Sequence, residues 1–266
     1  LYNNHKNVMR RHMSLILSEK KNGILTITIN RPEKKNALTR EMYQSMADAL
    51  FSIENDDSIK TVLFRGEGDC FTSGNDISDF AGRKEGDDVN ESAAFMRGLI
   101  NCKVPVVAQV HGMAVGIGTT MLLHCDFIYA ETNTRFVLPF INLGLVPEFA
   151  SSYLLPKMAG HVKASEWLML GEPFGTEDAC QFGLITGSYS AEELAEKVTS
   201  VCKKLVAKPS FALMQTKSLL KNDVESTHHY MDIEFDVFGQ AMDSEAAREA
   251  FDAFLSKRPI NPEKFK

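Results

Sequence analysis

The sequence predicts an α/β fold, because short apolar strands alternate with helices over roughly the first 190 residues and helices alone follow. Two further observations support this class. An alternating apolar segment behind an Asn-Gly turn predicts an N-terminal hairpin, and two glycine-rich segments each stand between an expected strand and an expected helix. A sheet covered by helices accounts for all three observations, although periodicity does not reveal the strand order.

The N-terminal hairpin is predicted from local chemistry. Residues 24–29 read ILTITI, an alternation of β-branched and apolar side chains that is typical of a strand. The turn Lys21-Asn22-Gly23 precedes them, and the apolar residues 15–17 precede the turn. We therefore expect two paired strands here.

Helix and strand signals alternate after the hairpin. Thr39 is suited to be an N-cap, and apolar residues recur at helical spacing until the polar stretch 55–58 interrupts them. The expected elements that follow are a strand at 61–64, a helix at 92–102, a strand at 104–110, a helix at 116–124 and a strand at 127–130.

The chain divides by composition into three parts. Residues 1–13 carry three basic side chains and no acidic one, and we interpret them as an extension outside the fold. Residues 14–190 form the expected α/β core. Residues 191–266 form a helical segment with apolar faces, which we expect to cover the site and to pack in an oligomer.

The bulk composition excludes several classes of protein. The 266 residues are 44% hydrophobic and carry a net charge of -6, which argues against binding to nucleic acid. No apolar run is long enough to span a bilayer, so we expect a soluble protein without a membrane partner. Five widely spaced cysteines indicate reduced thiols, and histidines without ligand spacing indicate no metal site.

The two glycine-rich segments, 70–77 and 111–118, are the candidates for chemistry. Neither has the spacing of a dinucleotide or a phosphate-binding loop. Glycine lets a ligand oxygen approach the backbone, and the first N–H groups of a helix have no internal acceptor. The two segments could therefore form an oxyanion hole, or each could simply make a tight turn between a strand and a helix.

Five ordered landmarks resemble those of the crotonase (enoyl-CoA hydratase/isomerase) superfamily. The resemblance extends over residues 14–258 and implies a spiral of ββα repeats in two roughly perpendicular sheets, assembled as a homotrimer or homohexamer. Its landmarks are Asn30–Leu38, Phe71–Asp76, His111–Gly118 followed by Cys125-Asp126, Leu143–Pro147 and Phe182–Ile185.

The resemblance also implies a substrate and a site. A CoA thioester would bind with its carbonyl oxygen between the backbone N–H groups of Ser73 and Ile117, and CoA would be part of the substrate, with no separate cofactor. The implied contacts to substrate or CoA are Lys35, Ala37, Gly74, Asn75, Asp76, Ile77 and Gly116.

The carboxylates distinguish this chain from the hydratases it resembles. Hydratases of the superfamily use two glutamates, and the matching positions here are Thr120 and Phe140. A single acid, Glu148, follows Pro147 in an apolar stretch, which resembles the peroxisomal-type Δ3,Δ2-enoyl-CoA isomerases. The competing interpretation is that Pro147 begins a helix and Glu148 complements its dipole in the first turn.

Other residues have two readings as well. Asp76 could bind substrate or hydrogen-bond the loop after Gly74. Thr120, Phe140 and Phe149 are candidates for the acyl pocket, but the aromatic residues also suit a core. Basic side chains that could meet the phosphates of CoA are Arg31, Lys34, Lys35 and Lys257, each of which also suits a solvated surface.

The sequence thus predicts an enoyl-CoA isomerase of fatty-acid β-oxidation with Glu148 as its single acid/base. The alternatives are a 2-enoyl-CoA hydratase with an atypical catalytic acid and a non-catalytic acyl-CoA-binding module. We expect a cytoplasmic location, or a peroxisome or mitochondrial matrix in a eukaryote.

Overall fold

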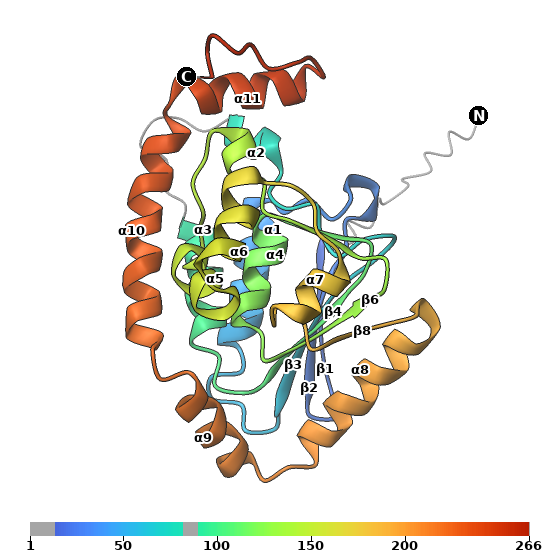
Figure 1. The fold of residues 1–266 in the computed structure, drawn as a ribbon. Coiled ribbons are helices and arrows are strands. Elements are labelled where there is room, and N and C mark those ends of the chain that lie inside the picture. The colour runs from blue at the N-terminus through green and yellow to red at the C-terminus, as the bar shows by residue number, and fades with distance from the viewer. Residues whose placement is uncertain (1–13, 82–89, 266) are drawn as a thin grey trace, which may run out of the picture.

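The computed structural model describes residues 14–81 and 90–265, and within them a six-stranded sheet forms the centre of a mixed α/β fold (Figure 1). The first two strands pair antiparallel and every later neighbour is parallel. In sheet order the strands are β1 (Ile16–Lys21), β2 (Ile24–Ile29), β3 (Thr61–Gly66), β4 (Val106–Val110), β6 (Phe127–Glu131) and β8 (Gly187–Tyr189). The predicted hairpin is confirmed by the pairing of β1 with β2.

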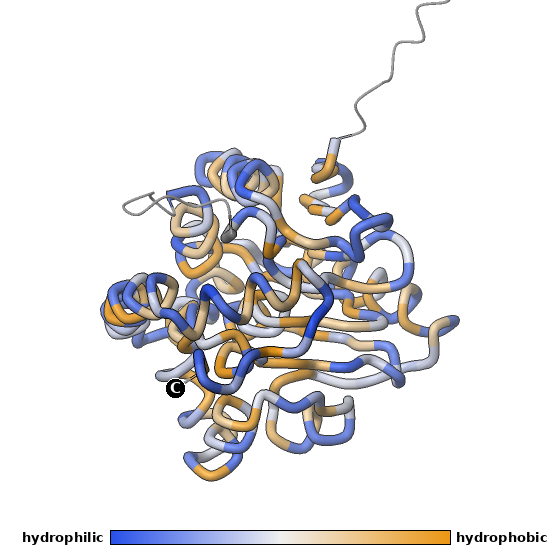
Figure 2. The backbone as a smooth tube through the Cα atoms, turned by 90° about the horizontal axis from the view of Figure 1, so that it is seen from above, coloured by the Kyte–Doolittle hydropathy of each residue, from blue (hydrophilic) through white to orange (hydrophobic). Residues whose placement is uncertain are grey.

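Helices cover both faces of this sheet. On one face, α1 (Arg40–Phe51) packs against α3 (Asn90–Ile100), and Thr39 caps α1 as predicted by accepting from the N–H of Met42. On the other face lies α8 (Ala191–Val206), whose apolar side chains form a second core cluster with Val107. The apolar segments in Figure 2 accordingly gather on interior strands and on the helix sides that face them.

A second, smaller sheet lies beside the first. It pairs β5 (Met113–Val115) with β7 (Arg135–Val137) in parallel. Isolated bridges extend it, joining Thr72 to Ala114 and Leu38 to Asn75. Both glycine-rich segments therefore belong to this smaller sheet.

The C-terminal helices form an arc along one side of the molecule, from α9 (Ser210–Leu220) through α10 (Val224–Met242) to α11 (Glu245–Leu255) (Figure 1). Helix α10 packs against α5, and α11 packs against α2 and η3. The remaining elements are η1 (Pro32–Lys34), α2 (Ile77–Ala81), α4 (Ile117–Thr120), η2 (Met121–His124), η3 (Ile141–Leu143), α5 (Ser151–Ala159), α6 (His161–Ser165), η4 (Glu166–Leu170) and α7 (Thr176–Gln181).

Several expected boundaries differ from the structure. The helix expected at 92–102 spans Asn90–Ile100, and the strand expected at 61–64 extends to Gly66. The strand expected at 104–110 begins at Val106, and the helix expected at 116–124 is the short helix α4 followed by the 3-10 turn η2. The interpretation of residues 1–13 as an extension lies outside the described residues. No helix in 14–81 or 90–265 combines the length and the apolar character needed to cross a membrane.

Candidate active site

The two glycine-rich segments run side by side in the smaller sheet. Thr72 donates its N–H to the carbonyl of Met113 and accepts from the N–H of Val115, both at 3.1 Å. Gly74 has a φ of 87°, and a Cβ at this position would lie 2.7 Å from the carbonyl oxygen of Val115. Only glycine permits both this backbone conformation and this close approach.

Where Leu38 pairs with the first glycine-rich segment, the backbone N–H of Asn75 has no acceptor among the described residues. The carbonyl of Gly74 accepts from Leu38 at 2.8 Å, and the N–H of Asp76 donates to Leu38 at 2.9 Å. In a parallel bridge of this kind, the residue between those two partners directs its own N–H and C=O away from Leu38. That direction leads toward the segment carrying Val115, and no acceptor for the Asn75 N–H is found in the part of the chain that the structure describes.

The prediction that Ser73 supplies an oxyanion donor is wrong in this structure. The N–H of Ser73 points to the opposite side and donates to the carbonyl of Lys35 at 2.9 Å. A donor that is already paired has little to offer to a substrate oxygen. The group that faces the second glycine-rich segment is the N–H two residues later, at Asn75.

For the second predicted donor, Ile117, no acceptor of its N–H is found among residues 14–81 and 90–265. Ile117 is the first residue of α4, and the N–H groups of a first helical turn have no acceptor within the helix. Gly116 precedes it with φ 54° and ψ -118°, a conformation that glycine adopts readily, and its own N–H donates to Val137. The chain thereby turns abruptly from β5 into α4 and leaves the helix N-terminus open.

Glu148 is buried against this helix, with 5% of its surface exposed. The hydroxyl of Thr120, at the end of α4, donates to Glu148 Oε1 at 3.1 Å. Burial raises the pKa of Glu148 to about 8, against the opposing effect of the Thr120 hydrogen bond. The helix after Pro147 begins only at Ser151, so the interpretation of Glu148 as a first-turn residue is wrong.

Tyr43 lies near both Glu148 and Asn75. Its hydroxyl, delivered by α1, donates to the side-chain oxygen of Asn75. Burial raises the pKa of Tyr43 well above its usual value, and the nearby charge of Glu148 raises it further. Asn75, Ile117 and Glu148 therefore converge from three separate segments.

The candidate acyl-pocket residues are all buried, but their neighbours differ. Thr120 binds Glu148, as described above. Phe149 stacks on the ring of His124 with centroids 4.0 Å apart and meets Phe95 edge-on, so its ring is packed in the apolar core. Phe140 also belongs to that core. The role of Phe140 in an acyl pocket stays a prediction.

Hydrogen bonds and an ion pair stabilise the loop that contains the predicted CoA contacts. Buried Asn36 donates to the carbonyls of Glu67 and Cys70, each at 2.8 Å. Asp76 pairs with Arg31 at 2.6 Å and accepts from the N–H of Ser78, which supports its reading as a loop-stabilising residue. These bonds hold the backbone that presents Asn75.

Lys35 and Ala37 also lie in this loop. Lys35 pairs with Asp69 at the surface, and the carbonyl of Ala37 accepts from Arg31. Ile77 begins α2. Contacts from these residues to CoA stay a prediction.

Sequence reasoning missed three residues of this site. Tyr43, Asn36 and Glu234 carry no motif that separates them from ordinary helix or loop residues. The partners that give them a role at the site are distant in the sequence: Asn36 bonds Glu67 31 positions away, Tyr43 bonds Asn75 32 positions away, and Glu234 bonds Ser152 82 positions away. Asn36 alone had a signal, because it lies in the Asn30–Leu38 landmark.

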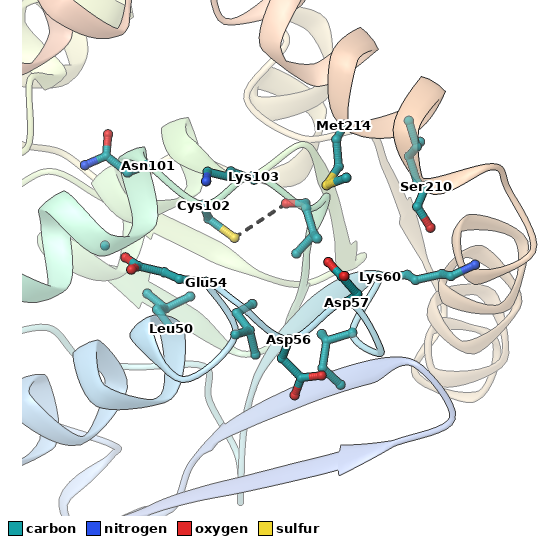
Figure 3. A pocket seen from close by; sticks show the side chains of 15 residues that line it. Leu50, Glu54, Asp56, Asp57, Lys60, Asn101, Cys102, Lys103, Ser210 and Met214 are labelled. Atoms are coloured by element: carbon teal, nitrogen blue, oxygen red, sulfur yellow. Dashed lines mark hydrogen bonds between the residues drawn. The ribbon is translucent and has the colours of Figure 1, made fainter.

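A pocket of about 290 Å³ lies elsewhere, between the ends of α1 and α3 and the start of α9 (Figure 3). Acidic side chains Glu54, Asp56 and Asp57 and the basic Lys60 line it together with apolar groups. It contains none of the residues that converge on Glu148. In the described part of the chain, no three His, Cys, Asp or Glu side chains are placed to hold a metal ion.

The arrangement favours chemistry on an enolate. Two backbone donors, at Asn75 and Ile117, can stabilise a developing negative charge on one oxygen. A buried carboxyl with a pKa near neutrality can accept and return a proton. The hydratase positions, Thr120 and Phe140, offer no second carboxylate.

Comparison with known proteins identifies a family to which the chain is similar. The family model described as "Enoyl-CoA hydratase/isomerase" matches residues 19–264. The chain is 32% identical to 1,2-epoxyphenylacetyl-CoA isomerase of Escherichia coli, with 92% of this chain and 97% of that protein covered. It is 36% identical to enoyl-CoA delta isomerase 2 of Rattus norvegicus, with 92% of this chain covered, and spans 64% of that protein's length.

A solved structure shows the same fold. The enoyl-CoA hydratase/isomerase from Pseudoalteromonas atlantica superposes with a TM-score of 0.89 at 35% identity. The superposition covers 93% of this chain and 99% of that one. The α/β class predicted from the sequence is confirmed.

Proposed function

The chain belongs to the enoyl-CoA hydratase/isomerase family, and we propose that it is a Δ3,Δ2-enoyl-CoA isomerase with Glu148 as its single acid/base. The observation that carries this proposal is the position of the Glu148 carboxyl. It is buried, and it is bound to the hydroxyl of Thr120, where hydratases place a glutamate. Thr120 lies in α4, the helix that Ile117 begins, and Tyr43 lies near Glu148 and bonds the side chain of Asn75.

The first step breaks the C2–H bond of a 3-enoyl thioester. The proton moves to the Glu148 carboxylate, and the electron pair of the bond delocalises over the diene to the thioester oxygen. The N–H groups of Asn75 and Ile117 receive that oxygen. Each such donor contributes roughly 3 to 4 kcal/mol in comparable oxyanion holes, which offsets much of the low acidity of the α-proton.

The second step returns the same proton at C4. A C4–H bond forms, the carbonyl is restored, and the double bond now lies between C2 and C3. Atoms and electrons balance without water or a redox partner. One carboxyl therefore suffices, because it acts as base in the first step and as acid in the second.

Hydration would require more than this site offers. A water must be deprotonated while a second group assists, yet the other buried carboxylate nearby, Glu234, is engaged with the backbone N–H groups of Ala150 and Ser152. This engagement favours isomerisation over the hydratase alternative. Burying the Glu148 carboxyl costs folding free energy, and a protein that only binds acyl-CoA would not need it. The buried carboxyl therefore argues against the non-catalytic alternative.

Matched thioesters test the proposal. The protein is incubated separately with a 3-enoyl-CoA and with the 2-enoyl-CoA of the same chain length, and the products are separated by chromatography. We expect conjugated 2-enoyl-CoA from the first substrate and no 3-hydroxyacyl-CoA from the second. Hydration of the second substrate would establish a hydratase, and binding of both without conversion would establish a binding module.

Assembly is a separate proposal. We expect a homotrimer or homohexamer, and the molar mass in solution measures it. Three apolar side chains of α9 are exposed in the single chain, which fits this expectation: Phe211, Leu219 and Leu220.

A further inference from the structure

Glu234 lies close to the site but belongs to the C-terminal arc. It projects from α10 and is buried, with 6% of its surface exposed. One carboxylate oxygen accepts from the N–H of Ala150 at 2.5 Å, and the other accepts from the N–H of Ser152 at 2.8 Å. Both carboxylate oxygens of Glu234 therefore accept hydrogen bonds from the turn 148–152, whose donors lie 82 and 84 residues earlier in the sequence.

That turn needs an external partner. Phe149 and Ala150 both have positive φ values, 61° and 56°, which cost roughly 1–3 kcal/mol each for residues with a Cβ. Ala150 is also the N-cap of α5, and its side chain cannot accept the hydrogen bonds that a serine or aspartate would. The local sequence therefore supplies neither a relaxed turn nor a helix cap, and Glu234 provides the missing acceptors.

The same turn carries Glu148. The carbonyl of Glu148 accepts from the N–H of Ser151 at 3.1 Å and from its hydroxyl at 2.6 Å. Movement of Ala150 or Ser152 would therefore move the backbone of Glu148 and displace its carboxyl from Thr120. A displacement of about 1 Å in an active site can lower the rate about 100-fold.

We propose that Glu234 is a positioning residue, which reaches from α10 to hold the turn 148–152 so that the Glu148 carboxyl faces Thr120. The proposal rests on the proposed function in taking Glu148 as the acid/base. Through this contact, the C-terminal helices contribute to the catalytic geometry as well as to the cover of the core.

The contact between Glu234 and the turn also affects the pKa of Glu148. The negative charge of Glu234 adds to burial in raising the pKa of Glu148. Among the described residues, Thr120 from α4 bonds the Glu148 carboxyl, Tyr43 from α1 lies near its charge, and His124 from η2 contacts Phe149 of the turn. Burial holds the pKa of His124 at about 3, so its ring is neutral and donates to the carbonyl of Phe149 at 2.8 Å.

A purely structural tether would predict different behaviour. If Glu234 merely joined α10 to α5, its replacement would lower the melting temperature and, through the lost charge, shift the titration of Glu148, but kcat at a pH where Glu148 is ionised would stay at the wild-type value. A positioning residue must also change that kcat, because it sets the place of the carboxyl. The test therefore measures the titration and the plateau value of kcat together.

The experiment compares Glu234→Gln and Glu234→Ala with Asp236→Asn, an exposed charge change on the same helix. The Glu148 carboxyl is titrated by ¹³C NMR, assigned with Glu148→Gln, and kcat and KM are measured against pH with a 3-enoyl-CoA. We expect Glu234→Ala to lower kcat about 10- to 100-fold with a small change in KM. We expect Glu234→Gln, which keeps one acceptor, to lose less activity and to shift the Glu148 titration to lower pH.

The outcomes are distinguishable. A wild-type plateau kcat in Glu234→Ala would overturn the positioning role, even if the Glu148 titration shifts or the variant is less stable. Full activity of Glu148→Gln would instead overturn the proposed function. In that event the Glu148 titration would still show whether Glu234 acts on the carboxyl. A shift of equal size in Asp236→Asn would also overturn the proposal.

Discussion

The six-stranded sheet and the site beside it are built in opposite ways. Along β2, β3 and β4 the strands pair residue by residue in an unbroken register, and the ladder uses the backbone groups between them. At the site, single bridges hold the chain, and the N–H groups of Asn75 and Ile117 have no acceptor among the residues that the structure describes. A carboxyl is also buried there at the expense of its ionisation. The framework satisfies its polar groups, whereas the site keeps a few unsatisfied for a substrate.

Both regions join segments that are far apart in the sequence. The sheet pairs Ile24 with Thr61 across 37 residues, and the site joins Thr120 to Glu148 across 28 and Ala150 to Glu234 across 84. The regions differ in how they use their polar groups, so changes in the framework should alter stability first and changes at the site should alter activity first.

The largest expected effect is on activity. Glu148→Gln keeps the shape of the side chain but removes its ability to take the C2 proton. We expect kcat to fall by roughly 10² to 10⁴-fold, the usual contribution of a general acid/base. Steady-state kinetics with a 3-enoyl-CoA measures the loss, and the exposed Glu196→Gln serves as the matched control. Activity within a factor of two of wild type would remove Glu148 from the mechanism.

A substitution in the core of the six-stranded sheet should lower stability and leave kcat nearly unchanged. Phe64 is fully buried in β3 and meets the ring of Phe95 edge-on. We expect Phe64→Ala to lower the free energy of unfolding by about 3–5 kcal/mol, because it opens a cavity in the core. Denaturant unfolding measures this loss. The folded fraction should keep a near-normal kcat, and a large fall in kcat would contradict the separation of the two regions.

Paired glycine substitutions sharpen the contrast. Gly74→Ala places a Cβ against the Val115 carbonyl at a positive φ, and we expect a loss of roughly 1–3 kcal/mol together with lower activity, since Asn75 is displaced. Gly98 lies in α3, where an added Cβ would meet its nearest neighbour at 3.4 Å. Gly98→Ala should be neutral or stabilising by about 1 kcal/mol. Melting curves and kcat/KM for both variants would expose any reversal of this order.

A further expected effect concerns the pH dependence of activity. Because the pKa of Glu148 is raised to about 8, its proton-accepting form is scarce at low pH. We expect kcat/KM to rise about tenfold per pH unit below that value and to level off above it. A flat profile between pH 6 and 8 with about constant kcat/KM would place the titration elsewhere.

Stability should change with pH in the opposite direction. A carboxyl whose pKa is higher in the folded than in the unfolded state contributes stability fully below the unfolded pKa. That contribution is lost as the pH rises from about 4.5 through about 8. The wild type should therefore lose stability relative to Glu148→Gln over this range, which paired melting curves measure.

Local chemistry explains which parts of the fold were predictable. The hairpin followed from an Asn-Gly turn between alternating strands, and α1 followed from the Thr39 cap and its apolar face. These signals lie within a few residues of the structure they produce. The break of the 116–124 helix into α4 and η2 has no such local marker.

The site was only partly accessible for the same reason. The segment that carries a donor was found from its glycine, but the donor itself was placed at Ser73 instead of Asn75. Only the pairing of Ser73 with Lys35, 38 residues earlier, shows which side each N–H faces. Proline before Glu148 suggested a helix start, yet two left-handed residues delay the helix to Ser151.

By itself, the sequence determined the α/β class, the hairpin, the capped helices and the replacement of the hydratase acids by Thr120 and Phe140. These depend on side-chain identity and on neighbours along the chain. Only the tertiary structure decided which N–H groups stay unpaired, that Glu148 is buried against Thr120, and that Glu234 holds its turn. Hydrogen-bond pairing and desolvation depend on segments that meet after folding, and no local pattern encodes them.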